Sequence, residues 1–274
     1  MNAKWLAKEY ILSVHAWLLD RLSDPILAAN KIFCDQHKGE RCFILGSGPS
    51  IKEQDLTRLS GELVMTQNHF HAHDDIKTIN PSYHVNVPMY QPAEYHDDWR
   101  QWLTGMNERL PTSTTLFFGK NTKCMVDELG LFQGRSYYIK TGGSFVTRRT
   151  APVDLTRTIM PVPTVLTQCL AIAIYMGFSE IVLTGFDLDQ IFLKMQDRSK
   201  VRFYGLSPIT DNEAEETAEK EAAQYGKEWF YWWMIWQQCF LLKDVAEKKG
   251  IRVVNATRGG LLNVFPRKIF EDMV

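Results

Sequence analysis

The stretch RCFILGSGPS, residues 41–50, decides the fold that this sequence predicts. Four apolar residues follow Arg41 without a break, which is typical of a strand buried on both faces of a parallel sheet. The chain then turns through Gly46-Ser47-Gly48-Pro49-Ser50, where glycines permit a sharp bend and leave backbone N–H groups uncovered. We expect a helix to begin at Pro49 or Ser50, with these N–H groups facing a phosphate or nucleotide.

The turn departs from two familiar phosphate-binding motifs. It lacks the Gly-Lys-Ser/Thr of a P-loop, and Ile51 stands where a dinucleotide-binding fingerprint has its third glycine. A plain tight turn is therefore the alternative interpretation of residues 46–50.

The same pattern of strand followed by helix recurs along the chain. Apolar runs predict further strands at 62–66, 83–87, 115–118, 180–184 and 251–254, and helical spacing predicts helices at 163–176 and 216–248. Strands alternating with helices imply an α/β fold with a doubly wound, mostly parallel Rossmann-like sheet. We expect an N-terminal helical extension over residues 1–38, then one nucleotide-binding domain over residues 39–274 with a lid at about 190–215.

Composition excludes several classes of function. The formal net charge of the 274-residue chain is −1, so no overall positive charge recruits nucleic acid. Five scattered cysteines without metal spacing indicate reduced thiols and a cytoplasmic protein. No apolar run reaches the roughly 20 residues that cross a bilayer. The apolar stripe of residues 5–21 predicts a helix that packs on the domain or a second subunit, or rests on a membrane surface.

Three polar segments follow predicted strands, where ligands of parallel sheets bind. Thr184-Gly185-Phe186-Asp187 places a carboxylate just past a strand, where it can bind a ribose, a base or a metal, or cap a turn. Asn68 ends another strand and offers an amide to a nucleotide. Residues 255–260, Asn-Ala-Thr-Arg-Gly-Gly, add an amide, a hydroxyl and a guanidinium at the same edge.

Three further features have weaker interpretations. His69, His71 and His73 alternate beside two aspartates, but no second ligand cluster follows at metal spacing, so we expect solvated histidines and no metal site. The cationic, aromatic stretch 198–205 suits a lid over a phosphate or is a solvated charge run. The aromatic face of residues 229–240 indicates core packing or a subunit interface, with a sugar platform as the alternative.

Taken together, two of these stretches resemble the bacterial sialyltransferases of glycosyltransferase family 42. They are residues 43–51, FILGSGPSI, and residues 171–187, AIAIYMGFSEIVLTGFD. The same stretches, with residues 254–260, resemble the MptE-like proteins, which include a 6-hydroxymethylpterin diphosphokinase and accessory proteins of surface glycosylation. The resemblance covers roughly residues 40–90 and 160–265.

The sialyltransferase resemblance implies a GT-A-like variant of the Rossmann-like fold with a lid. It implies a cytoplasmic glycosyltransferase that uses a CMP-activated acidic sugar, without a metal or other cofactor, in lipopolysaccharide or other surface-glycan biosynthesis. The nucleotide would be held by Gly46, Ser47, Gly48, Pro49, Ser50, Asn68, Asn86, Thr164, Gly185, Phe186, Asp187 and Arg202. Its partners would be the nucleotide-sugar donor and a glycan or glycolipid acceptor, and we expect a homo-oligomer with peripheral contact to the inner membrane.

The resemblance also locates a catalytic tyrosine and a missing base. Tyr204 would hydrogen-bond the leaving phosphate, but Leu206 stands where the transferases carry their lid histidine, and no histidine follows His96. His71, Asp189 or His69 would then serve as the base. The alternatives are an MptE-like diphosphokinase that uses ATP and Mg²⁺, and a non-catalytic nucleotide-binding accessory protein of glycan assembly.

Overall fold

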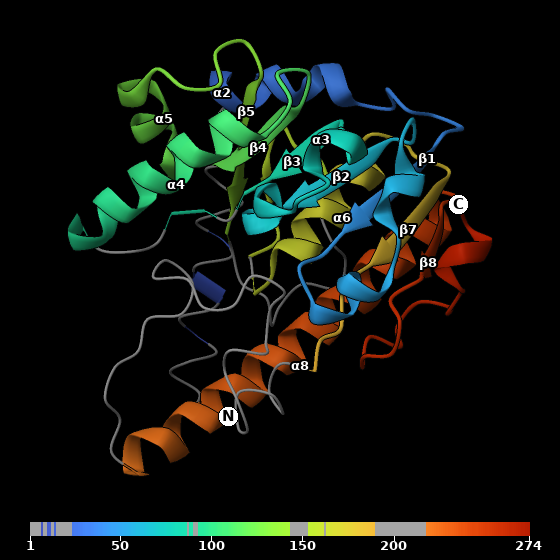
Figure 1. Ribbon diagram of the computed structural model, residues 1–274. Helices are drawn as coiled ribbons and strands as arrows, with labels where there is room; N and C mark the ends of the chain where they lie inside the picture. Colours follow the sequence, from blue (N-terminus) through green and yellow to red (C-terminus); the bar gives the residue numbers. More distant parts are fainter. Residues whose placement is uncertain are drawn as a thin grey trace.

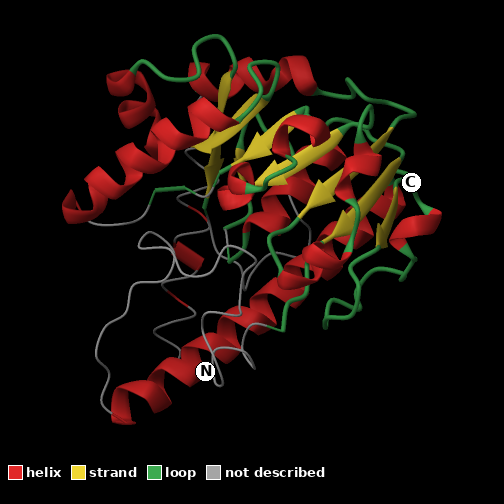
Figure 2. Cartoon of the chain, viewed as in Figure 1, coloured by secondary structure: helices red, strands yellow, loops and turns green. Residues whose placement is uncertain are grey.

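The computed structural model describes residues 7, 10, 11, 14, 24–86, 88–89, 93–142, 153–161, 163–189 and 218–274. Their centre is a parallel sheet, shown in Figures 1 and 2, in which the strand order is β6-β5-β4-β3-β2-β1-β7-β8. The strands are β1 (Arg41–Leu45), β2 (Val64–Gln67), β3 (Tyr83–Val85), β4 (Thr115–Gly119), β5 (Ser136–Thr141), β6 (Thr158–Ile159), β7 (Glu180–Thr184) and β8 (Arg252–Asn255).

The chain winds outward from β1 in two directions. It adds β2 to β6 on one side and then returns to add β7 and β8 on the other, so the order reverses between β1 and β7. Every strand pair is parallel, and Leu45 at the end of β1 lies beside Thr184 at the end of β7. This is a doubly wound Rossmann-like α/β fold, and it confirms the predicted fold class.

Helices cover both faces of the sheet. They are α2 (Pro25–Ala28), α3 (Ile76–Ile79), α4 (His96–Arg109), α5 (Lys123–Leu129), α6 (Val165–Tyr175) and α8 (Ala218–Lys248). Short 3-10 turns are η1 (Ala29–Phe33), η2 (Pro49–Glu53), η3 (Leu56–Leu59), η4 (Asn68–Ala72), η5 (Ala93–Tyr95), η6 (Lys120–Thr122) and η8 (Phe270–Asp272).

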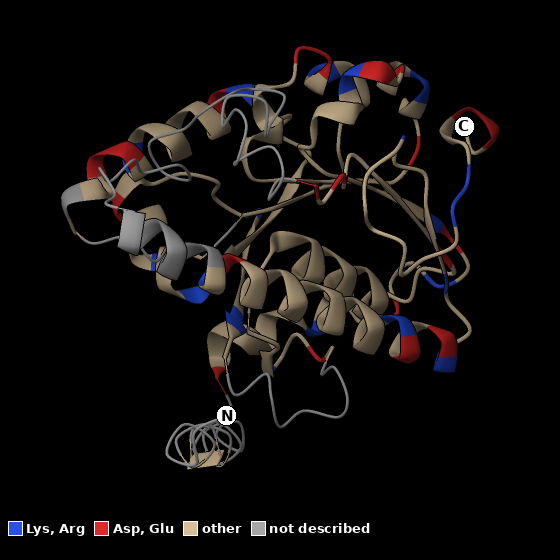
Figure 3. Ribbon diagram, turned by 90° about the horizontal axis from the view of Figure 1, so that it is seen from below, with Lys and Arg blue, Asp and Glu red and all other residues tan. Residues whose placement is uncertain are grey.

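Alternate residues of β1 belong to two separate cores. Cys42 and Ile44 pack with α6 and α8, whereas Phe43 and Leu45 pack on the opposite face with α3, α4 and α5. In the ribbon of Figure 3, the colours of Lys, Arg, Asp and Glu lie mainly on helices and loops outside the sheet, and the stretch of α8 from Trp229 to Leu242 has none of these residues. The sheet is therefore buried on both sides, and its carboxyl edge is left to bind ligands.

Most predicted elements exist, and the misses have physical causes. The bounds of β1 and β7 match the prediction, and α6 and α8 fall within a few residues of it. Residues 136–141 and 158–159 were not predicted as strands, because the partly exposed β5 alternates too little and β6 has two residues. Three of the five free cysteines are buried, as expected for small core residues.

The helix predicted to begin at Pro49 or Ser50 is wrong. Only the single 3-10 turn η2 follows the glycine turn, and Gln54 leaves it in an extended conformation. The Gln54 amide donates to the Ala256 carbonyl oxygen at 2.9 Å, and Asp55 then caps the next 3-10 turn. A tertiary hydrogen bond thus ends the turn before a helix can propagate.

Residues 24–38 pack closely on the sheet. Asp24 accepts a hydrogen bond from the Ile26 N–H at the start of α2, where Pro25 occupies the first turn. The buried Asn30 amide donates to the carbonyl oxygens of Tyr138 and Leu155, 2.7 and 2.9 Å away. The domain boundary at residue 38 remains a prediction, and the proposed lid lies outside the described residues. Within the described chain, no helix has both the length and the apolar character to cross a bilayer.

Candidate functional site

The two glycine turns predicted to form the site meet at the point where the strand order reverses. The Gly46 N–H donates to the Thr184 carbonyl oxygen at 2.8 Å, and the Gly48 N–H donates to that of Gly185 at 2.9 Å. Gly185 has φ +73°, a conformation that favours glycine. The predicted convergence of these two turns is confirmed.

The glycines of the first turn are required by its contact with the second. A Cβ on Gly46 would lie 2.2 Å from the Gly185 carbonyl oxygen, and one on Gly48 would lie 1.7 Å from Asp187 Oδ2. The space above both glycines is therefore filled by the turn after β7. Whether Gly46, Ser47, Gly48 and Pro49 also contact a nucleotide stays a prediction.

Asp187 holds the position that an anion would take on the first turn. The Ser50 hydroxyl donates to Asp187 Oδ2 at 2.9 Å, and the Ser50 backbone N–H also bonds the carboxyl group. Burial, with a smaller contribution from the neighbouring Asp189 carboxylate, raises the pKa of Asp187 to about 6 against the effect of these hydrogen bonds. These hydrogen bonds fix the orientation of the Asp187 carboxyl group, whose oxygens have lone pairs for further hydrogen bonds.

The segment after β8 locks the Asp187 turn from the other side. The Phe186 N–H donates to Thr257 Oγ1 at 3.0 Å, and the Leu261 N–H donates to the Asp187 carbonyl oxygen at 2.6 Å. Asn255 binds the Leu262 carbonyl oxygen and the Thr257 N–H within its own loop. The amide and hydroxyl predicted at this edge are thus used to position loops. Sequence reasoning missed Gln54, whose only signal was its place after the glycine turn.

The histidine segment after β2 packs inward on α4. His69 lies against Trp102, with ring centroids 4.5 Å apart, and His73 stacks on Phe70. This corrects the expectation of solvated histidines: His71 is 6% exposed, since η4 turns the segment back onto α4. The described residues hold no group of three or more side chains suited to a metal.

A hydrogen bond joins the side chain of His71 to the backbone of Asn68. Asn68 has φ +48°, and its carbonyl oxygen accepts a hydrogen bond from His71 Nδ1 at 3.0 Å. Burial lowers the pKa of His71 to about 4, outweighing the Asn68 hydrogen bond. His84, buried beside it, also has a lowered pKa because of burial, and its Nδ1 pairs with Thr66 Oγ1. The imidazole of His71 is therefore neutral at pH 7.

This state of His71 can be checked directly. We expect its imidazole to titrate near pH 4 in the folded chain, because protonation would place a charge in a buried site near Arg109. Folding stability from this group is lost as pH falls from about 6.5 towards 4. Two-dimensional NMR of ¹⁵N-labelled histidine, with His96 as a reference, measures it. A midpoint for His71 above pH 6 would contradict the buried geometry.

The remaining predicted residues are distributed along the same edge. Asn86 follows β3 and is fully buried. Thr164 occupies the N-cap position of α6, and its carbonyl oxygen accepts a hydrogen bond from the Thr167 hydroxyl at 2.8 Å. Phe186 packs in the core, and Asp189 has a buried Oδ1 without a hydrogen-bond partner in the described chain. Arg202 and Tyr204 lie outside the described residues, so their roles stay predictions.

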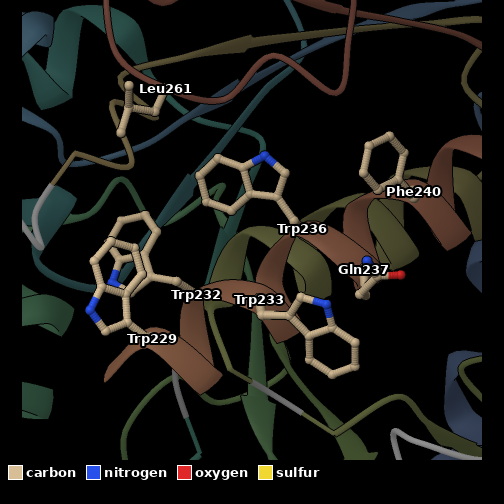
Figure 4. A pocket seen from close by; sticks show the side chains of 7 residues that line it. All are labelled: Trp229, Trp232, Trp233, Trp236, Gln237, Phe240 and Leu261. Atoms are coloured by element: carbon tan, nitrogen blue, oxygen red, sulfur yellow. The ribbon is translucent and has the colours of Figure 1, made fainter. Parts of the chain in front are cut away.

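Two cavities flank this edge. One of about 440 Å³ lies at the ends of β4 and β5, and sequence reasoning missed it; its lining includes Lys120, Asn121 and Lys140. The other, about 430 Å³, lies between α8 and Leu261, as Figure 4 shows. Its walls are Trp229, Trp232, Trp233, Trp236, Gln237, Phe240 and Leu261. Because the N–H of Leu261 binds the Asp187 carbonyl oxygen, this aromatic pocket is one loop away from the switch point.

Comparisons with known proteins find similarity only among solved structures. No family model matches the chain, and no curated protein does. The sialyltransferase CstII from Campylobacter jejuni, in complex with the substrate analogue cytidine-5'-monophosphate, aligns with a TM-score of 0.46 and 14% identity over 84% of this chain and 85% of its own.

Two further structures extend the comparison. A CstII complex with a trisaccharide acceptor and CMP gives a TM-score of 0.44 and 15% identity over 83% of this chain and 85% of its own. Prephenate dehydrogenase from A. aeolicus, in complex with hydroxyphenyl propionate and NAD+, gives a TM-score of 0.24 and 10% identity over 76% of this chain and 86% of its own. At these TM-scores the similarity carries no argument about activity, which must come from the residues of the site.

Proposed function

We propose that the chain is a glycosyltransferase that moves an acidic sugar from a CMP-activated donor to a glycan or glycolipid acceptor of a bacterial surface polysaccharide such as lipopolysaccharide. One observation carries the proposal. The two stretches that resemble family 42 sialyltransferases, far apart in sequence, adjoin at the switch point, where Ser50 binds Asp187 at 2.9 Å. Such switch points are where doubly wound sheets bind nucleotides.

The donor would bind along the carboxyl ends of β1, β2, β3 and β7. The Asp187 carboxylate, which Ser50 orients, would accept a hydrogen bond from a ribose hydroxyl. Asn68 and Asn86, which follow β2 and β3, would contact the nucleotide next to it, and Thr164 would contact it from the start of α6. These groups are neutral or acidic, so the charge of the phosphate needs the cationic residues of the lid, among them Arg202.

The chemistry would be a displacement with inversion at the anomeric carbon. The bond from that carbon to the CMP phosphate oxygen breaks as a bond to the acceptor hydroxyl oxygen forms, and the hydroxyl proton passes to a base. Tyr204 would donate a hydrogen bond to the departing phosphate. We assign the base to Asp189, on the same loop as Asp187, because its Oδ1 has no hydrogen-bond partner in the described chain. We give His71 the role of orienting Asn68, because its Nδ1 bonds the Asn68 carbonyl oxygen.

The acceptor has two places to bind. The cavity at the ends of β4 and β5 lies on the donor's own edge, and the aromatic pocket of α8 suits the hydrocarbon of a lipid-linked acceptor. Indole rings also favour the interface of a bilayer. We therefore propose peripheral contact with the cytoplasmic side of the inner membrane.

Titration with nucleotides tests the proposal. We expect intrinsic tryptophan fluorescence to saturate with CMP, without Mg²⁺, and not with ATP or GTP. The controls are the chain in CMP-free buffer and free tryptophan with CMP, which corrects for absorption. If CMP at millimolar concentration does not change the tryptophan fluorescence, the proposed activity is wrong.

A second outcome would favour the diphosphokinase. Asp187 and Asp189 lie close enough for one to raise the pKa of the other, and such a carboxylate pair suits Mg²⁺. Saturable binding of ATP that requires Mg²⁺ would support that activity. Binding of CMP without transfer to any acceptor would support the non-catalytic accessory role.

A further inference from the structure

The side chain of Gln168 carries a buried amide that has no partner among the described residues. Gln168 is the fourth residue of α6 and is 1% exposed, and neither its Oε1 nor its Nε2 has a hydrogen-bond partner in the described chain. Leaving a buried polar group unpaired lowers the stability of the folded state, because the group loses its hydrogen bonds to water. Such groups are rare in folded proteins, and each requires an explanation.

The position of Gln168 places it at the ligand-binding edge. Since α6 leads into the parallel strand β7, its first turns lie at the carboxyl edge of the sheet. The neighbouring Cys169 contacts the end of β2, with its Sγ 3.7 Å from Gln67 Oε1. Gln67 is the last residue of β2, the strand that pairs with β1 next to the glycine turn. The start of α6 thus packs against the end of β2, one strand away from the glycine turn.

Asn86, which follows the next strand of the sheet, also has a buried and unpaired amide in the described chain. It follows β3, is fully buried, and both atoms of its amide lack a partner in the described chain. Unpaired amides therefore occur on two elements at one edge, and each offers both a donor and an acceptor. A core position would be filled at lower cost by an apolar residue, so these amides indicate a ligand with donors and acceptors of its own.

We infer that Gln168, near the start of α6, forms part of the subsite that reads the base of the nucleotide. An amide pairs in bidentate fashion with a base edge that carries an adjacent donor and acceptor, as Asn and Gln do with adenine. Cytosine offers such an edge, an amino donor next to a ring-nitrogen acceptor. The inference rests on the proposed function for its choice of cytosine, but the pairing of the amides with a nucleobase does not.

The substitution Gln168→Met tests the inference because Met has a similar length and no strong hydrogen-bonding atoms. We expect the affinity of the full chain for CMP to fall at least tenfold, while the Tm without nucleotide stays the same or rises. Stability should not fall because the change removes two unpaired polar atoms. Gln101→Met, at an exposed position of α4, is the matched control and should change neither. Isothermal titration and thermal unfolding measure the two effects.

The outcomes separate this inference from the proposed function. If the wild-type chain binds CMP and Gln168→Met binds it within twofold, the inference is overturned and the proposed donor stands. If the wild-type chain prefers AMP or UMP and Gln168→Met weakens that binding, the inference is supported and the CMP donor is wrong. A lower Tm with unchanged nucleotide affinity would mean that internal water or packing satisfies Gln168, which overturns the inference.

Discussion

The substitution Gly46→Ala is expected to lower the Tm by roughly 10 °C. Its Cβ would lie 2.2 Å from the Gly185 carbonyl oxygen and 2.7 Å from the carbonyl carbon, both backbone atoms of the turn that follows β7. The turns after β1 and β7 must then separate, and the hydrogen bond from the Gly46 N–H to Thr184 weakens with them. Overpacking of this kind costs about 3 kcal/mol. In a domain of this size, each kcal/mol shifts the Tm by about 2–4 °C.

Gly105→Ala is the matched control. Gly105 lies in α4, and nothing lies within 4 Å of the position its Cβ would take. Because Ala favours a helix over Gly by about 1 kcal/mol, this variant should be slightly more stable. Differential scanning calorimetry of both variants checks the pair. Equal effects of the two substitutions would show that the turns are not in contact as described.

Asp187→Asn is expected to stabilise the folded chain at neutral pH while weakening its binding of CMP. Burial raises the pKa of Asp187 from 3.8 to about 6, so the folded state favours the protonated form. Stability from this group is complete below pH 4 and is lost as pH rises through about 6. A shift of this size corresponds to about 3 kcal/mol at pH 7 and above. The neutral Asn avoids that cost and keeps an oxygen for the Ser50 hydroxyl.

The measurement is chemical denaturation of wild type and Asp187→Asn between pH 4 and 8. The difference in their unfolding free energies should grow from near zero at pH 4 to its full value above pH 7. Subtracting the two curves cancels the opposite pH dependence of the buried His71. Asp127→Asn, an exposed carboxylate on α5, is the control. A difference between wild type and Asp187→Asn that does not change with pH would refute the buried carboxylate.

Much of the fold could be predicted because β1 and β7 are buried on both faces. An unbroken apolar run of three or four residues at or just before a glycine can be recognised without knowledge of the rest of the chain. β5 differs: four of its six residues are only partly buried, and its partner β6 is two residues long. Strands of this kind form because of the residues that pack beside them in the folded chain, and those residues are distant in the sequence.

The location of the candidate site could be predicted from the sequence, but the contacts between its residues could not. The rule that ligands bind at strand ends locates Gly46, Gly185 and Asp187 together. It does not show that Asp187 occupies the space above Gly48, because that contact depends on the path of the second turn. Nor does it reveal the unpaired amide of Gln168, which reads as one polar residue in an apolar helix. Both features depend on tertiary packing.

The strand order also has a consequence for synthesis of the chain. β1 occupies the middle of the sheet, yet its partner β7 emerges roughly 140 residues later, which at ribosomal rates takes on the order of ten seconds. During that time the part of the sheet formed by β1 to β6 can fold while β1 is still an open, apolar edge strand. Such an edge can pair with strands of other chains. Nascent copies of this protein should therefore depend on chaperones until β7 is made. Moving the two final strands ahead of β1 by circular permutation should relieve that dependence.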